Sequence, residues 1–220
     1  MSDLPLNLDF TKRVVFKAIE LVWDSSPTQG VYRKQFERSA AESGRVTSLV
    51  RFDAGANFPL HTHPLGEEIF VLQGTFSDEN GDYPAGTYLR NPPGSQHKPY
   101  SRDGCLIFVK LDHFQIGDNK LIVVRPEERE WLPGIGNLKV VPLHDYLGEH
   151  TALVQWPKGE RFLQHRHWGG EEILVVEGMF SDEHGNYPEH TWLRSPHLSK
   201  HAPFTDEDCL ILVKIGHLPE

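Results

Sequence analysis

Histidine and glutamate recur in this chain at a spacing typical of metal ligands. The segment HTHPLGEE and a downstream histidine supply His61, His63, Glu67 and His97. The segment HRHWGGEE repeats this pattern 104 positions later and supplies His165, His167, Glu171 and His201. Imidazole and carboxylate groups are side chains that bind borderline divalent metals. The repetition therefore predicts two metal sites, produced by duplication of one unit.

Strand geometry explains how these side chains would converge. Residues two apart on a β-strand face the same side, so His61 and His63 are expected to project together into a barrel interior. Glu67 would return to that face from the next strand, and His97 would arrive from a neighbouring strand after a Pro-Pro-Gly break. Such a set leaves one or two coordination positions open, as catalytic and ligand-binding metal sites do.

The pattern of the whole chain indicates a mainly β structure. Short apolar runs such as EEIFVLQG and EEILVVEG alternate with segments rich in Gly, Pro, Asn and Asp, and SDENGDYPAG indicates a hairpin. The segment TKRVVFKAIELVW fits a helix or a strand equally well. We expect two duplicated barrels, residues 1–118 and 119–220, with the linker in HFQIGDNK at 113–120 and a second irregular stretch at 129–136.

Composition excludes several classes of partner. The 220 residues carry a net charge of −9 without a basic run, which argues against direct binding of nucleic acid. No apolar run approaches the roughly 20 residues that span a bilayer, and the start MSDLPLNLDF does not resemble a signal peptide. We therefore expect a cytoplasmic protein. Cys105 and Cys209, also 104 apart, are expected to be core residues and not a disulfide.

The spacing of the first motif carries a resemblance. Gly55, His61-x-His63, Glu67 and Gly74 resemble the first motif of the cupin superfamily. The residues Gly86, Pro92-x-Gly94 and His97 resemble the second cupin motif. An asparagine usually closes that motif, but Ser101 stands there in the first half and Thr205 in the second. The resemblance implies an all-β fold of two tandem, jelly-roll-like cupin barrels.

The second half departs from this frame at two positions. His190 and Leu198 stand where the first half has Gly86 and Gly94. Because glycine often supplies a positive φ in such turns, we expect a disturbed turn before His201 and a weaker second site.

The sequence beyond these motifs resembles one branch of the cupin superfamily, the cupin domain of ChrR-type anti-sigma factors. In that family the cupin is a C-terminal sensory domain, and a helical N-terminal zinc domain with a Cys-x-x-Cys pair holds the sigma factor. Here about 20 residues precede the first cupin and Cys-x-x-Cys is absent, so sigma-factor binding is not expected. The resemblance implies a bicupin that binds or senses a small molecule or an oxidant.

Two other functions stay open. The first is a dioxygenase, most simply an iron enzyme acting on a small carbonyl or thiol compound; the second is a purely structural metal. Zinc and iron are the first choices, with Mn, Ni, Co and Cu also compatible with these ligands. A monomer or a homodimer fits a fused pair of barrels. Arg51 could face the first cavity and bind an anion, although an outward ion pair is the commoner use of arginine. Trp168 could narrow the second entrance or simply pack.

Overall fold

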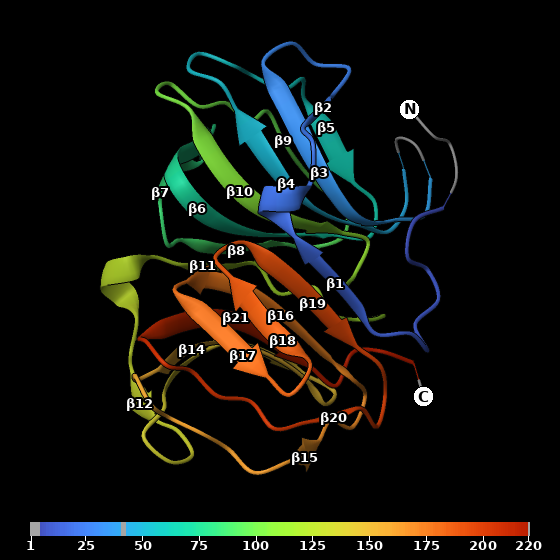
Figure 1. Cartoon of the computed structure of the whole chain (residues 1–220). Coiled ribbons are helices and arrows are strands. Elements are labelled where there is room, and N and C mark those ends of the chain that lie inside the picture. The colour runs from blue at the N-terminus through green and yellow to red at the C-terminus, as the bar shows by residue number, and fades with distance from the viewer. Residues whose placement is uncertain (1–4, 41–42, 220) are drawn as a thin grey trace. The chain divides into compact units, whose positions relative to one another are not determined.

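The regular secondary structure of the described residues is almost entirely antiparallel β-strand, as the sequence pattern predicted. A computed structural model describes residues 5–40 and 43–219 (Figure 1). The first four residues, which belong to the start judged unlike a signal peptide, lie outside that part. Two 3-10 turns, Ala18–Glu20 (η1) and Pro126–Glu128 (η2), are the helical elements of the described residues. No helix in this part is long and apolar enough to cross a membrane.

The first unit is built on an eight-stranded antiparallel sheet with its own apolar core, and a separate two-stranded pair carries histidines. The strand order is β11-β8-β6-β10-β4-β3-β2, β7 pairs with β6, and β5 pairs separately with β9. The strands are β2 (Asp24–Ser25), β3 (Val31–Arg38), β4 (Val46–Phe52), β5 (His61–His63), β6 (Glu67–Asp78), β7 (Gly81–Pro84), β8 (Tyr88–Asn91), β9 (Ser95–His97), β10 (Cys105–Leu111) and β11 (Ile122–Val124).

The second unit repeats this design. Its main sheet has the order β1-β19-β16-β21-β14-β13-β12, and β15–β20 and β17–β18 form the two small pairs. The strands are β1 (Val14–Lys17), β12 (Leu132–Pro133), β13 (Lys139–Tyr146), β14 (Glu149–Trp156), β15 (His165–Arg166), β16 (Glu171–Glu177), β17 (Met179–Asp182), β18 (Gly185–Pro188), β19 (Thr191–Ser195), β20 (Lys200–His201) and β21 (Cys209–Ile215).

The two halves of the sequence exchange one strand each. The N-terminal strand β1, blue in Figure 1, pairs with β19 of the second unit, so Val14 lies opposite Arg194. Strand β11, which follows the first repeat, pairs with β8 of the first unit, so Ile122 lies opposite Arg90. Because Arg90 and Arg194 are 104 apart, β1 and β11 occupy matching places in the two sheets. The ambiguous TKRVVFKAIELVW is thus a strand followed by a 3-10 turn.

This exchange divides the chain differently from the expected ranges 1–118 and 119–220. The first compact unit includes Val22–Arg129, and the second includes Asp9–Leu21 and Glu130–Glu220. The stretch at 113–120 is irregular, as expected, but belongs to the first unit. There Asp118 accepts a hydrogen bond from Nη2 of buried Arg90 at 2.5 Å.

Each unit has its own apolar core at matching positions. Phe52 packs edge-on against Phe76 in the first unit at 6.0 Å between ring centroids, and Trp156 packs likewise against Phe180 in the second at 5.4 Å. Inward alternation of strand residues produces this match. The cores contain Ile69, Val71, Ile173 and Val175, as expected, together with the two buried and free cysteines, Cys105 and Cys209.

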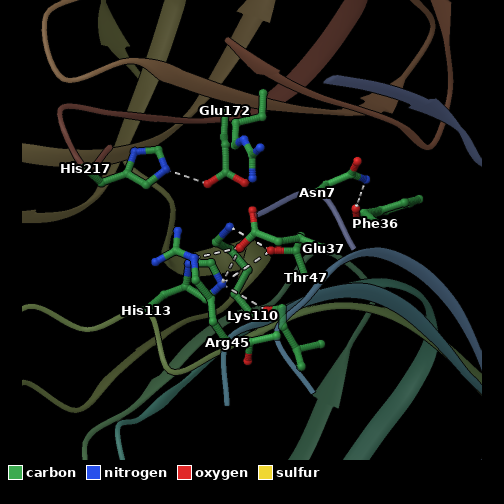
Figure 2. A network of polar contacts seen from close by, with 12 residues as sticks. Asn7, Phe36, Glu37, Arg45, Thr47, Lys110, His113, Glu172 and His217 are labelled. Carbon is green, nitrogen blue, oxygen red and sulfur yellow. Dashed lines mark hydrogen bonds and ion pairs between the residues drawn. The ribbon is translucent and has the colours of Figure 1, made fainter. Parts of the chain in front are cut away.

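One further histidine pair, His113 and His217, also recurs at a shift of 104, and it has a polar role inside each unit (Figure 2). His113 Nε2 lies 3.0 Å from the carbonyl oxygen of Val46 and 3.7 Å from Glu37 Oε1. His217 Nε2 lies 2.5 Å from Glu172 Oε2. Recurrence at this shift therefore marks structural histidines as well as candidate metal ligands.

Candidate metal centres

The first candidate centre is assembled by two short strands, β5 and β9, and by the start of the long strand β6. β5 and β9 pair so that His61 lies opposite His97, and β6 begins with Glu67. The rings of His61 and His63 are 4.7 Å apart between centroids, and each ring lies 4.9 Å from that of His97. One ligand atom from each of the four residues lies within 4.8 Å of the others. The structure thus brings together all four side chains that were predicted as ligands in the first half of the chain.

The donor atoms of this cluster fit a cation. Nε2 of His63 and Nε2 of His97 are buried without a hydrogen-bond partner in the described part of the chain. Glu67 Oε2 lies 3.3 Å from the first and 3.5 Å from the second. Nδ1 of His61 lies 2.9 Å from the carbonyl oxygen of Pro59, so this nitrogen is the donor and Nε2 keeps its lone pair. Buried polar atoms seldom lack partners, and a metal ion would satisfy these.

Side chains behind the ligands fix their orientation, and sequence reasoning missed them. Asp78 Oδ2 lies 3.3 Å from His97 Nδ1, and Tyr83 donates to Asp78 Oδ1 at 3.2 Å. Asn91 Nδ2 donates to Glu67 Oε2 at 2.9 Å. Such carboxylate–histidine contacts set the tautomer of a metal-binding ring. The signal was present, because Asp78 and Tyr83 also recur at a shift of 104.

The environment separates the protonation behaviour of the histidines. Burial lowers the pKa of His63 below its ordinary value and outweighs the attraction of Glu67. Burial acts in the same direction on His97, but the hydrogen bond to Asp78 and the charge of Glu67 outweigh it and raise the pKa of His97. Burial tends to raise the pKa of Asp78, whereas the hydrogen bond with His97 helps to lower it.

The second candidate centre keeps the histidines but not the carboxylate. His165, His167 and His201 form a group with ligand atoms within 4.8 Å, and Glu171 is not a member of it. Glu171 Oε2 lies 3.4 Å from His201 Nε2, but Oε1 faces Nδ1 of His167 at 3.6 Å. In the first centre the glutamate faces Nε2 of both histidines. The metal-binding roles of all eight residues remain predictions.

The carboxylate behind the second centre has an additional cationic partner. Asp182 Oδ2 lies 3.6 Å from His201 Nδ1 and accepts a hydrogen bond from Arg13 Nη2 at 3.0 Å. Arg13 also donates to the hydroxyl of Tyr187 at 2.6 Å. Burial tends to raise the pKa of Asp182, but hydrogen bonds with His201 and Tyr187, among others, lower it to about 2. In the first unit the matching strand position is Leu121, one residue before β11.

Burial dominates the titration of two other residues in the second centre. It lowers the pKa of His167 to about 3, with repulsion from His201 acting in the same direction. It also raises the pKa of Glu171 to about 7. Near neutral pH the metal-free centre therefore holds His167 uncharged and Glu171 only partly ionised.

The turn before His201 is intact, so the expectation of a disturbed turn is wrong. Leu198 adopts a φ of 62° where Gly94 has 81°, and His190 adopts 63° where Gly86 has 89°. The backbone N–H of Leu198 donates to the carbonyl oxygen of His167 at 2.9 Å, as Gly94 does to His63 at 2.8 Å. The second unit keeps the turn by placing non-glycine residues in the left-handed region, at a cost in strain.

The residues that replace the closing asparagine have a common role. Ser101 Oγ donates to the carbonyl oxygen of Thr75 at 2.7 Å, and Thr205 Oγ1 donates to that of Met179 at 2.9 Å. Both side chains are fully buried. The hydroxyl groups tie the end of the second motif to the opposite strand in both units.

Two cavities adjoin the first centre. An interior cavity of about 80 Å³ is lined by His61, Glu67 and His97 and by mainly apolar side chains. A larger cavity of about 540 Å³ is lined by polar residues that include Asp78 and Asn91 and by apolar residues that include Leu121 and Val123. Arg51 lines neither: it faces outward 3.6 Å from Asp53, which is the use of arginine expected as commoner. Trp168 is largely exposed and its ring lies against that of His197.

The barrels and their histidine clusters define a cupin that is duplicated within one chain. The ChrR cupin-like domain matches residues 11–115 and again residues 119–219, and the chain belongs to this family. A search of curated proteins found no match.

Solved structures share the fold at low sequence identity. A "putative dioxygenase" from Nostoc punctiforme aligns with a TM-score of 0.79 at 14% identity, covering 93% of this chain and 82% of that one. A nickel(II)-bound bacterial pirin from Escherichia coli aligns with a TM-score of 0.72 at 17% identity, covering 94% and 99%. Oxalate decarboxylase from Bacillus subtilis aligns with a TM-score of 0.66 at 15% identity, covering 92% and 77%.

Proposed function

We propose that the chain is a metal-dependent cupin that binds a small molecule or an oxidant at its first centre. The observation that carries this proposal is the convergence of His61, His63, Glu67 and His97 on one point. Two of their imidazole nitrogens are buried without a hydrogen-bond partner in the described chain. A structural role alone does not require the interior cavity that adjoins these ligands. That cavity gives a ligand room beside the metal.

Three imidazoles and one carboxylate suit a divalent first-row metal and leave one or two positions open. Iron and zinc remain the first choices, and the nickel(II) of the pirin supports the inclusion of nickel among the alternatives. When bound, the metal supplies a Lewis acid that polarises a coordinated oxygen. The chain holds His97 through Asp78 and Glu67 through Asn91, and these contacts keep both ligands oriented.

Metal content tests the proposal directly. Protein purified without chelators should contain between one and two equivalents of a first-row metal by elemental analysis. A chelated sample should regain metal when it is reloaded. A metal-free preparation that cannot be loaded with Fe(II), Zn(II) or Ni(II) would refute the proposal.

A second candidate, an iron-dependent dioxygenase, is supported by the mainly apolar wall of the interior cavity. Apolar side chains such as Phe58 and Phe76 line it beside His61 and Glu67, and they would pack against the apolar part of a bound substrate. The name given to the Nostoc punctiforme protein points in the same direction. Oxygen uptake by the iron-loaded chain should be measured against β-diketones, thiols and small phenols. Turnover would favour the enzyme, and tight binding without turnover would favour sensing.

Partners and compartment belong to the same proposal. We propose a small molecule as the ligand, a cytoplasmic location, and a monomer or a homodimer that binds neither nucleic acid nor membrane. We do not transfer sigma-factor binding, because the match to the family is to its cupin-like domain. Light scattering with multi-angle detection would determine the oligomeric state.

A further inference from the structure

Arg33 introduces a positive charge into the wall of the interior cavity. Among the described residues that line this cavity, the charged side chains are Arg33 and the candidate ligand Glu67, apart from the histidines. The remaining lining is apolar or prolyl, with Val31 and Phe52 as examples. A guanidinium in such surroundings is screened less than one in open solvent, so its charge bears more strongly on what the cavity binds.

The strand register explains why Arg33 faces the cavity. In β3, Val31 pairs with Phe52 of β4 and Arg33 pairs with Val50. Val31, Val50 and Phe52 all belong to the apolar core of the first unit. Alternation along β3 therefore places Arg33 on the inward face, where it is half-buried.

The second unit does not repeat this charge. Val140 of β13 pairs with Val154 of β14, and Val154 follows Val50 by 104 positions. Val140 thus occupies the register position of Arg33 and packs against the second apolar core. Within the described residues, the cation accompanies the centre in which all four candidate ligands converge.

We infer that Arg33 makes the first centre selective for small organic anions that carry a carboxylate. This inference rests on the proposed function, because the second donor atom of the anion would bind the open position of the metal. The planar guanidinium matches a carboxylate and can donate two parallel hydrogen bonds to it. A cavity of about 80 Å³ admits a ligand of only a few non-hydrogen atoms, such as a short 2-oxo acid.

Arg51 provides a matched control on the neighbouring strand. It pairs with Tyr32 on the opposite face of the same two strands, and its guanidinium stacks over Tyr32 at 4.5 Å and over Trp23 at 5.0 Å. Replacing Arg51 removes one positive charge from the same unit without changing the cavity. Any difference between the two arginine variants therefore reports on position and not on net charge.

The experiment compares pyruvate with its neutral isostere 2,3-butanedione. Both are titrated into the metal-loaded full-length chain by calorimetry, for the wild type and for Arg33→Val, Arg33→Lys and Arg51→Val. Arg33→Val should weaken pyruvate binding by about 10- to 100-fold, the usual worth of a hydrogen-bonded charge, and leave butanedione binding unchanged. Arg33→Lys should retain part of the affinity for pyruvate, and Arg51→Val should retain all of it.

Metal content measured on the same samples separates the two levels of the proposal. If the wild type cannot hold metal, the proposed function fails and this inference fails with it. If Arg33→Val is folded, holds metal and binds pyruvate within about threefold of the wild type, the inference alone is overturned. It is also overturned if the metal-loaded wild type binds neither pyruvate, acetate nor oxalate at millimolar concentration. Should Arg33→Val not fold, the Arg33→Lys and Arg51→Val titrations decide.

Discussion

The two candidate centres agree in their histidines and differ in their carboxylate. The imidazole rings lie 4.7 to 4.9 Å apart in the first centre and 4.7 to 5.1 Å apart in the second. Glu67 faces Nε2 of two histidines, whereas Glu171 faces Nδ1 of His167. Paired backbone strands carry most of the histidines, so duplication preserves them. Glu67 also accepts a side-chain hydrogen bond from Asn91, and the second unit has Ser195 at that position.

Between the two units, the residues that hold the ligands in place differ more than the ligands themselves. The residue directly before the exchanged strand is Arg13 in the second unit and Leu121 in the first. Arg13 donates a hydrogen bond to Asp182, the carboxylate behind the second group of histidines, and a leucine cannot do so. The first centre has an adjoining interior cavity with Arg33 in its wall. These differences support our proposal that the first centre is the functional one and that the second has altered support.

Removing the histidines should have the largest effect on this comparison. The double variant His61→Ala with His63→Ala should lose about one equivalent of metal, because two of its four candidate ligands are gone. The double variant His165→Ala with His167→Ala should lose the metal of the second centre, whatever its occupancy in the wild type. Elemental analysis of the purified proteins measures both.

The two double variants serve as controls for each other. Each should leave the metal of the other unit in place, since each centre is built from residues of its own unit. Full loading of either variant would show that the corresponding half is misassigned. Circular dichroism would verify that the β-structure is retained.

Exchanging the residue behind the glutamate should have the next largest effect. Asn91→Ser removes the hydrogen bond that holds Glu67 and should weaken metal binding at the first centre by about 10- to 100-fold. Ser195→Asn offers Glu171 the same support and should strengthen the second centre. Competition with a chromophoric chelator gives both affinities. Equal affinities in Asn91→Ser and the wild type would mean that Asn91 does not position the ligand.

The sequence predicted the ligands better than their surroundings. His61, His63, Glu67 and His97 could be identified because spacing along strands fixes which side chains meet. Asp78 was missed although it recurs, because its role depends on a contact between the end of β6 and His97 of β9. Arg33 was missed for another reason. Strand alternation shows which residues share a face of β3 and β4, but it does not show which face points inward. The sequence reasoning therefore considered Arg51, which lies on the face opposite to Arg33.

The strand exchange was beyond the reach of the sequence pattern. Matching β1 with β11 requires a shift that differs from 104, because Val14 and Ile122 are 108 apart. The pairing is long-range in the second unit, and nothing local in TKRVVFKAIELVW specifies its partner strand. The turn at Leu198 was misjudged because propensity disfavours leucine in the left-handed region, whereas the contacts around it hold the backbone there.

Acidification should affect the metal-free second unit through His167. Its folded pKa of about 3 lies below the ordinary 6.5, so unfolding takes up a proton between these values and stability falls as the pH falls through that window. Relative to His167→Gln, the chelated wild type should lose about 2 kcal/mol between pH 6.5 and 5. Urea unfolding followed by tryptophan fluorescence measures it, because Trp156 and Trp192 lie in the second unit.

Glu171 provides the opposing test of the same unit. Its folded pKa of about 7 lies above the ordinary 4.5, so unfolding releases a proton and the stabilisation is lost as the pH rises through 7. The chelated wild type should therefore lose stability relative to Glu171→Gln as the pH rises from 4.5 to 7. Parallel curves for the wild type and either variant would contradict the corresponding burial argument.

Relieving backbone strain should produce the smallest effect, with opposite signs in the two units. Leu198 adopts a φ of 62° and Gly94 one of 81° in matching turns. Leu198→Gly should stabilise the second unit by about 1 kcal/mol, because a side chain in the left-handed region is strained there. Gly94→Leu should destabilise the first unit by about the same amount, since a Cβ at Gly94 meets nothing within 4 Å and only the backbone is strained. Urea midpoints of the chelated proteins measure both, and equal signs would show that the two turns differ by more than strain.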